Sequence, residues 1–189
     1  MKRYTVFIFS CFIFLFCIAT IRAVPFGVNR SKGSYIVSTI SGSGIRGFLN
    51  GSKERAQFNW PTDVAIDGKG GIYVADYLNN LIRKINNSGE VATFAGSGRG
   101  AFADGKGEDA HLRGPDNIAI DDDGNIYVAD TDNFRIRKVM PDGFITTIAG
   151  NGIRGYRDGE WKTAMFAYPT GVAVDKDGNV YVADRGSHT

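Results

Sequence analysis

Short apolar runs alternate with turns rich in glycine, asparagine and aspartate along most of the chain. Residues 64–67 begin the pattern with a small apolar run, which is typical of a strand buried on both faces. The tight turn at 68–71 separates this run from a second at 72–76, and two more follow at 81–85 and 91–95. This pattern predicts short antiparallel strands and therefore an all-β fold.

The strand pattern repeats at a constant interval of 54 residues. The segment Tyr-Val-Ala-Asp ends at residues 76, 130 and 184, and no insertion disturbs the spacing. Other positions share the same interval: Pro61, Pro115 and Pro169, then Thr39, Thr93 and Thr147. Self-similarity at a fixed interval indicates a repeat architecture. Four antiparallel strands in each unit describe the blade of a β-propeller.

The repeated segments resemble a known family. Residues 169–175 followed by 178–184 are similar to the NHL repeat, and residues 135–139 are similar to its end. Residues 147–152, followed by Asp158 and Gly159, resemble the longer variety of the repeat that occurs in many secreted proteins. The resemblance covers about residues 35–189 and implies a β-propeller, typically with six blades. It does not choose a function, because the family includes enzymes, sensors and adhesion modules.

The chain is too short for a closed ring. We predict repeats at about 39–92, 93–146 and 147–189, the last one incomplete, and one strand of the fourth type at 35–40. The expected fold is a partial β-propeller of about two and a half four-stranded antiparallel blades, with 11 strands. We expect a truncated sequence. Association of two chains would give 22 strands where six blades need 24, so we expect no oligomer.

The N-terminal segment has a different character. Lys2 and Arg3 precede an apolar run that ends at Ile21, and Ala23 offers a small residue for cleavage. We predict a secretory signal peptide at 1–23 and a short linker at 24–34. The alternatives are an uncleaved membrane anchor, because roughly 18 apolar residues can span a bilayer, and a lipoprotein signal ending at Cys11. We favour cleavage because both basic residues lie ahead of the run.

The expected location is therefore secreted and extracellular, or periplasmic or on the cell surface in a bacterium, with no membrane insertion after cleavage. Cleavage would remove Cys11 and Cys17, the two cysteines of the chain, and with them any disulfide or thiol chemistry. It would also remove three of the 22 basic residues and none of the 20 acidic ones. The remaining charge is close to neutral, so we expect no nucleic-acid partner.

The richest loops are expected on one face of the propeller, where they follow the second strands and form the crossovers 42–60, 96–114 and 150–168. One polar set recurs on this face and gives the candidate ligand-binding residues Asp76, Asn79, Arg83, Asp130, Asn133, Arg137 and Asp184. Such a ring of groups could hold a ligand at the channel mouth. We favour the alternative, in which Asp and Asn cap their loops and Arg pairs with a carboxylate, because a single binding site does not need every copy.

The sequence gives no clear sign of catalysis or of a metal site. The Asp-rich segments 121–125 and 175–179 resemble calcium loops but lack the expected Glu at the twelfth position, and we interpret them as hairpin turns. His111 and His188 are the only histidines, and neither recurs in the repeat. NHL-related lyases use a histidine-bound metal, and this segment cannot assemble such a cluster. We predict no catalytic residue, no metal and no cofactor here.

Aromatic residues recur in two registers: Phe48, Phe102 and Tyr156, and also Phe58, Leu112 and Phe166, where leucine replaces one ring. Aromatic rows can bind sugars or peptides, but we expect both rows to fill the gaps between blades. Our first functional hypothesis is an extracellular scaffold that binds a protein or glycan partner through its loop-rich face. The alternative is part of a lyase or lactonase-like hydrolase with catalytic residues in further blades, so enzyme status stays open.

Overall fold

The computed structural model describes residues 37–189. The predicted signal peptide, the linker and the first two residues of the predicted opening strand lie outside the described residues. Residues 37–40 contain no assigned strand, so the described chain has ten strands where the repeat predicted 11. None of the helices in residues 37–189 is long and apolar enough to cross a membrane.

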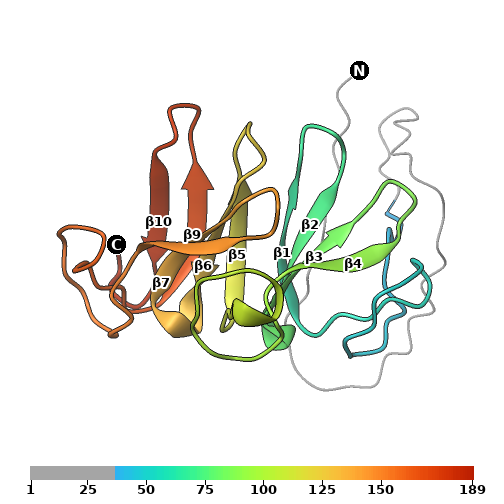
Figure 1. Ribbon diagram of the computed structural model, residues 1–189, viewed down its shortest axis with the longest axis horizontal. Helices are drawn as coiled ribbons and strands as arrows, with labels where there is room; N and C mark the ends of the chain where they lie inside the picture. The colour runs from blue at the N-terminus through green and yellow to red at the C-terminus, as the bar shows by residue number, and fades with distance from the viewer. Residues whose placement is uncertain (1–36) are drawn as a thin grey trace.

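The ten strands form three antiparallel sheets that follow one another across the molecule (Figure 1). The first sheet contains β1 (Pro61–Ile66), β2 (Ile72–Asp76), β3 (Leu81–Ile85) and β4 (Val91–Ala95). The second contains β5 (Pro115–Ile120), β6 (Ile126–Asp130), β7 (Arg135–Val139) and β8 (Ile145–Ala149). The third contains β9 (Pro169–Val174) and β10 (Val180–Asp184). The prediction of an all-β partial propeller is confirmed.

Strand positions agree with the sequence pattern except at the first strand of each blade. That strand was expected to begin at residue 64, but β1 begins at Pro61, which pairs with Asp76 across the sheet. A register shift separates this pair from the regular ladder, and the same shift follows Pro115 in the second sheet. Proline cannot donate to a ladder, and an irregularity allows it to sit at the strand's first position. The apolar pattern alone therefore predicted a start for this strand that lies too far along the sequence.

The main hydrophobic core lies between the first two sheets. Ile82 and Ala95 of the first sheet pack there with Ile126, Val128 and other residues of the second, and all of them are buried. Leu112, from the crossover between the sheets, is a fully buried member of this cluster. Burying one such aliphatic side chain stabilises the fold by roughly 1.5–3 kcal/mol. Each blade therefore depends on its neighbour for its core.

Short turns after β2 and β6 connect these strands to the third strand of each blade. They form the 3-10 helices η1 (Tyr77–Asn79) and η3 (Thr131–Asn133), and a third such helix, η2 (Gly107–Asp109), lies in a crossover. The residue after η1, Asn80, has φ 55°, and its counterpart Phe134 has φ 53°. This left-handed conformation reverses the chain direction, and asparagine tolerates it better than most residues.

The first strands of neighbouring blades lie next to each other, since β1 contacts β5 and β5 contacts β9. The crossovers instead reach the outermost strands, where Gly51 bridges to Val91 of β4 and Gly105 bridges to Ile145 of β8. The crossovers and the turns after β2 and β6 meet through backbone hydrogen bonds, including Leu78 N to Asn59 O. The expected loop-rich face therefore forms.

Candidate functional site

In both complete blades, the recurring polar residues form a compact buried network. In the first blade, Arg83 Nη1 donates to Asp76 Oδ2 at 2.8 Å, and Asn79 Nδ2 donates to the same oxygen at 2.8 Å. The side chains of Asp76 and Arg83 expose no surface. Arg83 therefore pairs with a carboxylate, as we favoured from the sequence, and the pair lies within one blade.

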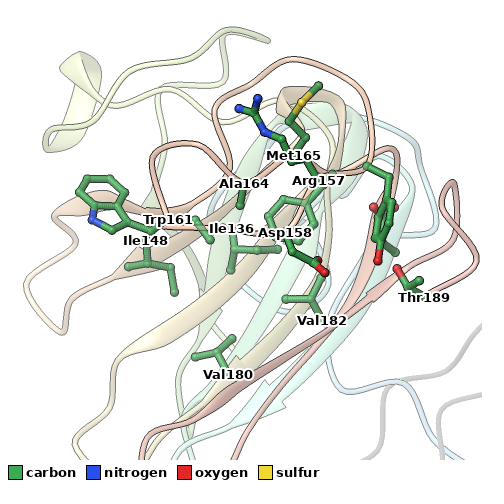
Figure 2. A pocket seen from close by; sticks show the side chains of 15 residues that line it. Ile136, Ile148, Arg157, Asp158, Trp161, Ala164, Met165, Val180, Val182 and Thr189 are labelled. Atoms are coloured by element: carbon green, nitrogen blue, oxygen red, sulfur yellow. The ribbon is translucent and has the colours of Figure 1, made fainter.

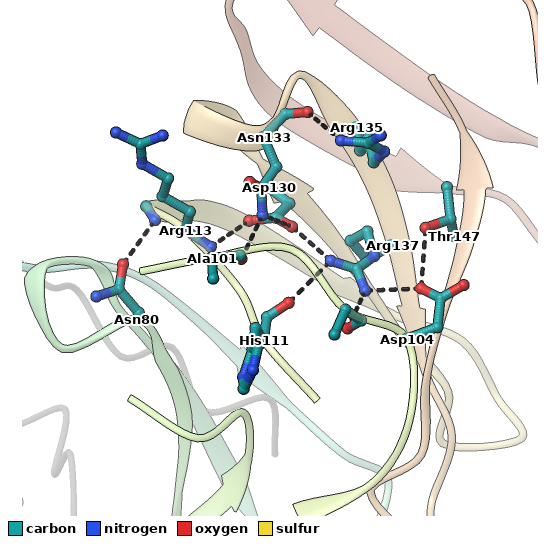
Figure 3. A network of polar contacts seen from close by, with 12 residues as sticks. Asn80, Ala101, Asp104, His111, Arg113, Asp130, Asn133, Arg135, Arg137 and Thr147 are labelled. Carbon is teal, nitrogen blue, oxygen red and sulfur yellow. Dashed lines mark hydrogen bonds and ion pairs between the residues drawn. The ribbon is translucent and has the colours of Figure 1, made fainter. Parts of the chain in front are cut away.

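The second blade repeats this network (Figure 3). Arg137 Nη1 donates to Asp130 Oδ2 at 2.7 Å, and Asn133 Nδ2 donates to the same oxygen at 2.8 Å. Arg113 N also donates to Asp130 Oδ1 at 2.7 Å. Direct contact of these residues with a ligand stays a prediction, because in the described structure their polar atoms face one another.

The arginines also hold the crossover loops in place. Arg137 Nη2 donates to Ala103 O at 2.8 Å and to Asp104 Oδ1 at 2.7 Å (Figure 3). Arg83 Nη2 makes the corresponding bonds to Leu49 O at 3.2 Å and Asn50 Oδ1 at 2.7 Å. One guanidinium therefore joins a strand, a turn and a loop that are distant in sequence.

Burial shapes the electrostatics of these networks. It raises the pKa of Asp76 and of Asp130 above the usual range for a carboxyl group, while hydrogen bonds and the paired arginine oppose the shift. A buried carboxylate is tolerated only when its charge and lone pairs are satisfied. The arginine and the backbone amides that face each aspartate provide this compensation.

The third copy of the network is incomplete in residues 37–189. Asp184 is buried and accepts from Ala167 N at 2.7 Å and Tyr168 N at 2.6 Å. No arginine or lysine of the described chain forms an ion pair with Asp184, in contrast to Asp76 and Asp130. Backbone amides alone therefore satisfy this carboxylate.

The two aromatic rows behave differently. Phe48, Phe102 and Tyr156 expose 57%, 44% and 61% of their surface, so the prediction that this row fills gaps between blades is wrong. Leu112 and Phe166 pack in clusters that join neighbouring sheets, so the prediction is confirmed for these two residues. Phe58 packs in a cluster whose strand residues all belong to the first sheet. The rows differ because the residues of the first row lie on the outer part of each crossover. The residues of the second row lie where the crossover reaches the first strand of the next blade.

Each exposed ring of the complete blades rests on the buried arginine beneath it. The guanidinium carbon of Arg83 lies 5.4 Å from the ring centroid of Phe48, and that of Arg137 lies 4.9 Å from Phe102. Arg135 stacks more closely on Phe102, at 3.7 Å. A cation over an aromatic face stabilises the ring's position. Each ring therefore contacts at least one guanidinium and still exposes about half of its surface to solvent.

A second polar group, which the sequence did not reveal, joins the first strands of the three sheets. Asp63 Oδ2 of β1 accepts from Asn117 Nδ2 at 2.7 Å and from Ile118 N at 2.9 Å, both on β5. Asn117 Oδ1 in turn accepts from Val172 N of β9 at 2.7 Å. Residues 63, 117 and 171 share one register, and Gly171 ends the series. That shared register is the signal that could have identified them.

Titratable groups gather beside these strands. Burial, together with the charge of Asp63, raises the pKa of Asp116. Tyr77 Oη donates to Asp132 Oδ2 at 3.3 Å, and burial, Tyr168 and Asp132 raise the pKa of Tyr77. We call Asp63, Asp116, Asp132 and Tyr77 the inner cluster. Perturbed groups of this kind often mark functional sites, although structural networks perturb pKa values too.

The structure also contains a close contact between a serine and a histidine that the sequence did not predict. Ser97 Oγ lies 2.6 Å from His111 Nδ1, and the same oxygen accepts from Arg99 N at 3.2 Å. His111 corresponds to Gln57 and Met165 in the other repeats, so this contact occurs once. Residues 37–189 hold no group of three or more His, Cys, Asp or Glu arranged to bind a metal ion.

The Asp-rich segments are hairpin turns, as predicted. Asp121 Oδ1 accepts from Asn125 N at 2.8 Å, and Asp121 Oδ2 accepts from Asn125 Nδ2 at 2.8 Å. Asp175 and Asn179 make the same two bonds in the third sheet. These aspartates therefore stabilise the turns that join the first two strands of a blade.

An open pocket of about 580 Å³ lies between the second and third sheets (Figure 2). Ile136 and Ile148 of the second sheet form one wall, and Val180 and Val182 of β10 form the other. Trp161 and Arg157 come from the crossover that joins the two sheets. The pocket therefore lies between neighbouring blades, has both apolar and charged lining residues, and includes no member of the inner cluster.

Comparison with known proteins agrees with the repeat and the fold described above. The family model of the NHL repeat matches residues 58–85, 112–139 and 166–189. The protein SUPPRESSOR OF QUENCHING 1, chloroplastic, from Arabidopsis thaliana is 30% identical over 165 residues, which cover 80% of this chain and 16% of that protein.

Two solved structures from Bacteroides share the fold. A protein of unknown function from Bacteroides thetaiotaomicron matches with a TM-score of 0.68 and 25% identity, over 82% of this chain and 38% of that one. An auxiliary nutrient binding protein from Bacteroides ovatus matches with a TM-score of 0.60 and 26% identity, over 83% and 39%. The chain spans less than two fifths of each of the three proteins.

Proposed function

This chain belongs to the NHL-repeat β-propeller proteins, and from that premise we propose that it is a secreted interaction scaffold which binds a protein or glycan through its crossover loops. On a repeat scaffold, binding commonly resides in loops that a rigid framework positions. The similarity to an auxiliary nutrient binding protein from Bacteroides ovatus supports a binding role.

The exposed aromatic row carries this proposal. Phe48, Phe102 and Tyr156 present about half of their surface to solvent from equivalent points of successive crossovers. Arg83 and Arg137 hold two of these crossovers through partly buried hydrogen bonds, so little conformational freedom is lost when a partner binds. Rigid aromatic rings provide large contact area at low entropic cost and dominate many interfaces.

The test is a binding screen of the purified chain, residues 24–189, against immobilised glycans and extracellular proteins. We expect Phe102→Ala to weaken the strongest interaction by about tenfold, because hot-spot aromatics typically contribute more than 1 kcal/mol. Phe144→Ala is the matched control, since Phe144 is exposed but lies at the β7–β8 turn, on the opposite face. Equal losses for both variants, or binding unaffected by Phe102→Ala, would refute the loop-face proposal.

An enzymatic role is the second candidate, and the inner cluster is the observation that favours it. Asp63, Asp116 and Asp132 bring carboxyl groups together with Tyr77 where the first strands meet. Carboxyl groups with shifted pKa values serve as general acids or bases in many enzymes. Hydrolysis of a lactone panel that is abolished by Asp116→Asn, with loop-face binding unchanged, would favour the enzyme over the scaffold.

A further inference from the structure

The two ends of the blades differ in charge. Because successive strands are antiparallel, the crossovers lie at one end of the sheets, and the hairpin turns after the first and the third strands lie at the other (Figure 1). The three crossovers contain nine lysines and arginines but only six aspartates and glutamates, so their net charge is positive. The hairpin turns contain two basic and eight acidic residues and are negative; they are 67–71, 86–90, 121–125, 140–144 and 175–179.

The positive charge belongs to the outer part of the loop-rich face. The inner cluster places three carboxyl groups where the first strands meet. Asp76 and Asp130 add no free charge, because Arg83 and Arg137 pair with them. An anion is therefore repelled from the inner ends of the blades and attracted to the crossovers.

An exposed arginine precedes each exposed aromatic ring of the crossovers by two or three residues. The pairs are Arg46 and Phe48, Arg99 and Phe102, and Arg154 and Tyr156. None of these three arginines forms an ion pair within residues 37–189, whereas the crossover lysines 53 and 106 each contact a carboxylate. Each crossover therefore offers an uncompensated guanidinium and an aromatic surface that are close together in the chain.

Arg135 of β7 adds a further cation at the second crossover. Its guanidinium carbon lies 3.7 Å from the ring centroid of Phe102. Its Nη1 donates to Asn133 O at 3.0 Å (Figure 3), and its Nη2 donates to Asn151 O of the third crossover at 2.9 Å. The guanidinium is therefore fixed between two neighbouring crossovers.

The surroundings of Arg135 favour an incoming anion. Its side chain is partly buried, its two hydrogen-bond acceptors are neutral carbonyl groups, and it forms no ion pair within the described chain. Burial and the charge of Arg137 lower the pKa of Arg135, although Asp130 and Asp104 oppose the shift. A bound anion would replace the solvation that this cation has lost.

We propose that the crossovers bind an anionic polysaccharide, with Arg135 and Phe102 at the centre of the site. Sulfate or carboxylate groups of the polymer pair with Arg135, Arg99 and Arg154, because a guanidinium matches both anions in a bidentate geometry. The sugar rings pack on Phe102. A polymer with repeated charges and rings suits a surface that presents an arginine and an aromatic ring on each successive crossover.

This inference rests on the proposed binding role of the loop-rich face and names the class of glycan. Two anionic polymers test it on the chain, residues 24–189: heparin fragments, which are sulfated, and polygalacturonate fragments, which are carboxylated. Dextran is the uncharged reference. We expect saturable binding to at least one anionic polymer in surface plasmon resonance, weaker binding to dextran, and an affinity that falls as NaCl is raised, because salt screens charge pairs.

Three variants assign the binding to the crossovers. Arg135→Gln should weaken binding by about tenfold, because it removes a charge-assisted hydrogen bond. Arg99→Gln should weaken it by about threefold, and this exposed position keeps the test valid if Arg135→Gln does not fold. Lys176→Gln is the matched control, since it removes one positive charge from an exposed hairpin turn, and it should change the affinity by less than about twofold. Circular dichroism checks the folding of each variant.

The proposed function and this inference can fail separately. If Phe102→Ala weakens the binding of another partner while Arg135→Gln and Arg99→Gln do not, the loop-rich face binds but the anionic class is wrong. If neither anionic polymer binds at about 1 mM, the inference is also wrong. Equal losses for Lys176→Gln and Arg135→Gln would show that overall charge alone attracts the polymer. Tighter binding to single-stranded DNA than to both polysaccharides would assign the surface to another class of polyanion.

Discussion

At the scale of single residues, two buried guanidinium groups each connect one crossover loop to its blade. Arg137 contacts Asp130, Asp104 and the backbone of His111 and Ala103, which come from one strand end and one crossover. Removing the arginine would break these bonds and would leave the buried carboxylate of Asp130 without its cation. The second effect is the larger one, because an uncompensated buried charge is very unfavourable.

We therefore predict that Arg137→Met lowers the free energy of unfolding by about 3–5 kcal/mol. Adding Asp130→Asn should recover more than half of this loss, because no buried charge then remains unpaired. Urea denaturation followed by circular dichroism measures both. Arg99→Met, at an exposed position, is the control and should have little effect. If the double variant were no more stable than the single one, desolvation of Asp130 would not be the cause.

At Gly150, both the backbone conformation and the lack of space for a side chain require glycine. Its φ of 97° favours glycine, and a Cβ placed there would lie 2.5 Å from Phe134 O. Gly178 has a similar φ of 83°, but a Cβ there would meet nothing within 4 Å.

We predict that Gly178→Ala costs roughly 1–2 kcal/mol of unfolding free energy from backbone strain alone. Gly150→Ala should cost clearly more, because the backbone around Phe134 must also move. Thermal unfolding measures the stability of both variants, and the difference between them gives the cost of the contact between a Cβ at position 150 and Phe134 O. Equal losses would show that the contact with Phe134 O is relieved without strain.

At the scale of elements, the packing of β1 against β5 brings two carboxyl groups together. Burial and the charge of Asp63 raise the pKa of Asp116, and burial raises the pKa of Asp63. A carboxyl group with a raised pKa in the folded state binds its proton more tightly when folded than when unfolded. Its contribution to stability is present below the unfolded pKa and is lost as the pH rises through the folded pKa.

Asp116→Asn should therefore raise the urea midpoint at pH 7, well above the unfolded pKa of a carboxyl group, and should have a smaller effect near pH 3, below that pKa. Urea titrations of the variant and the unmodified chain at both pH values measure the difference. Asp142→Asn, at an exposed hairpin turn, is the control. A loss of stability at pH 7 for Asp116→Asn would contradict the direction of the shift.

At the scale of the whole molecule, the sheets depend on one another like the units of other repeat proteins. The core between the first two sheets is complete, whereas the third sheet packs on one side through Val172 and its neighbours. Local stability in such arrays follows the number of neighbouring units. The third sheet should therefore open more readily than the second.

Hydrogen exchange tests this difference, because β6 and β10 have nearly the same sequence. We expect the amides of Val180–Asp184 to exchange much faster than those of Ile126–Asp130, since β6 is paired on both edges and β10 on one. Nearly equal protection of the two strands would mean that the molecule unfolds as a single unit.

The sequence by itself determined the blade pattern. The 54-residue interval, the glycine-containing turns and the alternating apolar runs placed β2, β3, β4 and β8 at their observed bounds, because strand and turn preferences are local. The turn role of Asp121 and Asp175 followed from the same local chemistry. Even the pairing of Arg with Asp could be favoured, since its members recur in every complete copy.

Only the tertiary structure decided which repeated positions are buried and which are available to a partner. Phe48 and Phe58 recur equally regularly, yet one ring is exposed and the other is packed, because exposure depends on the path of the crossover in space. Asp63 and Asn117 meet only because β1 lies against β5. The repeat interval identifies which residues occupy equivalent positions. Contact between residues depends instead on how close two chain segments lie, and the packing of the blades sets that distance.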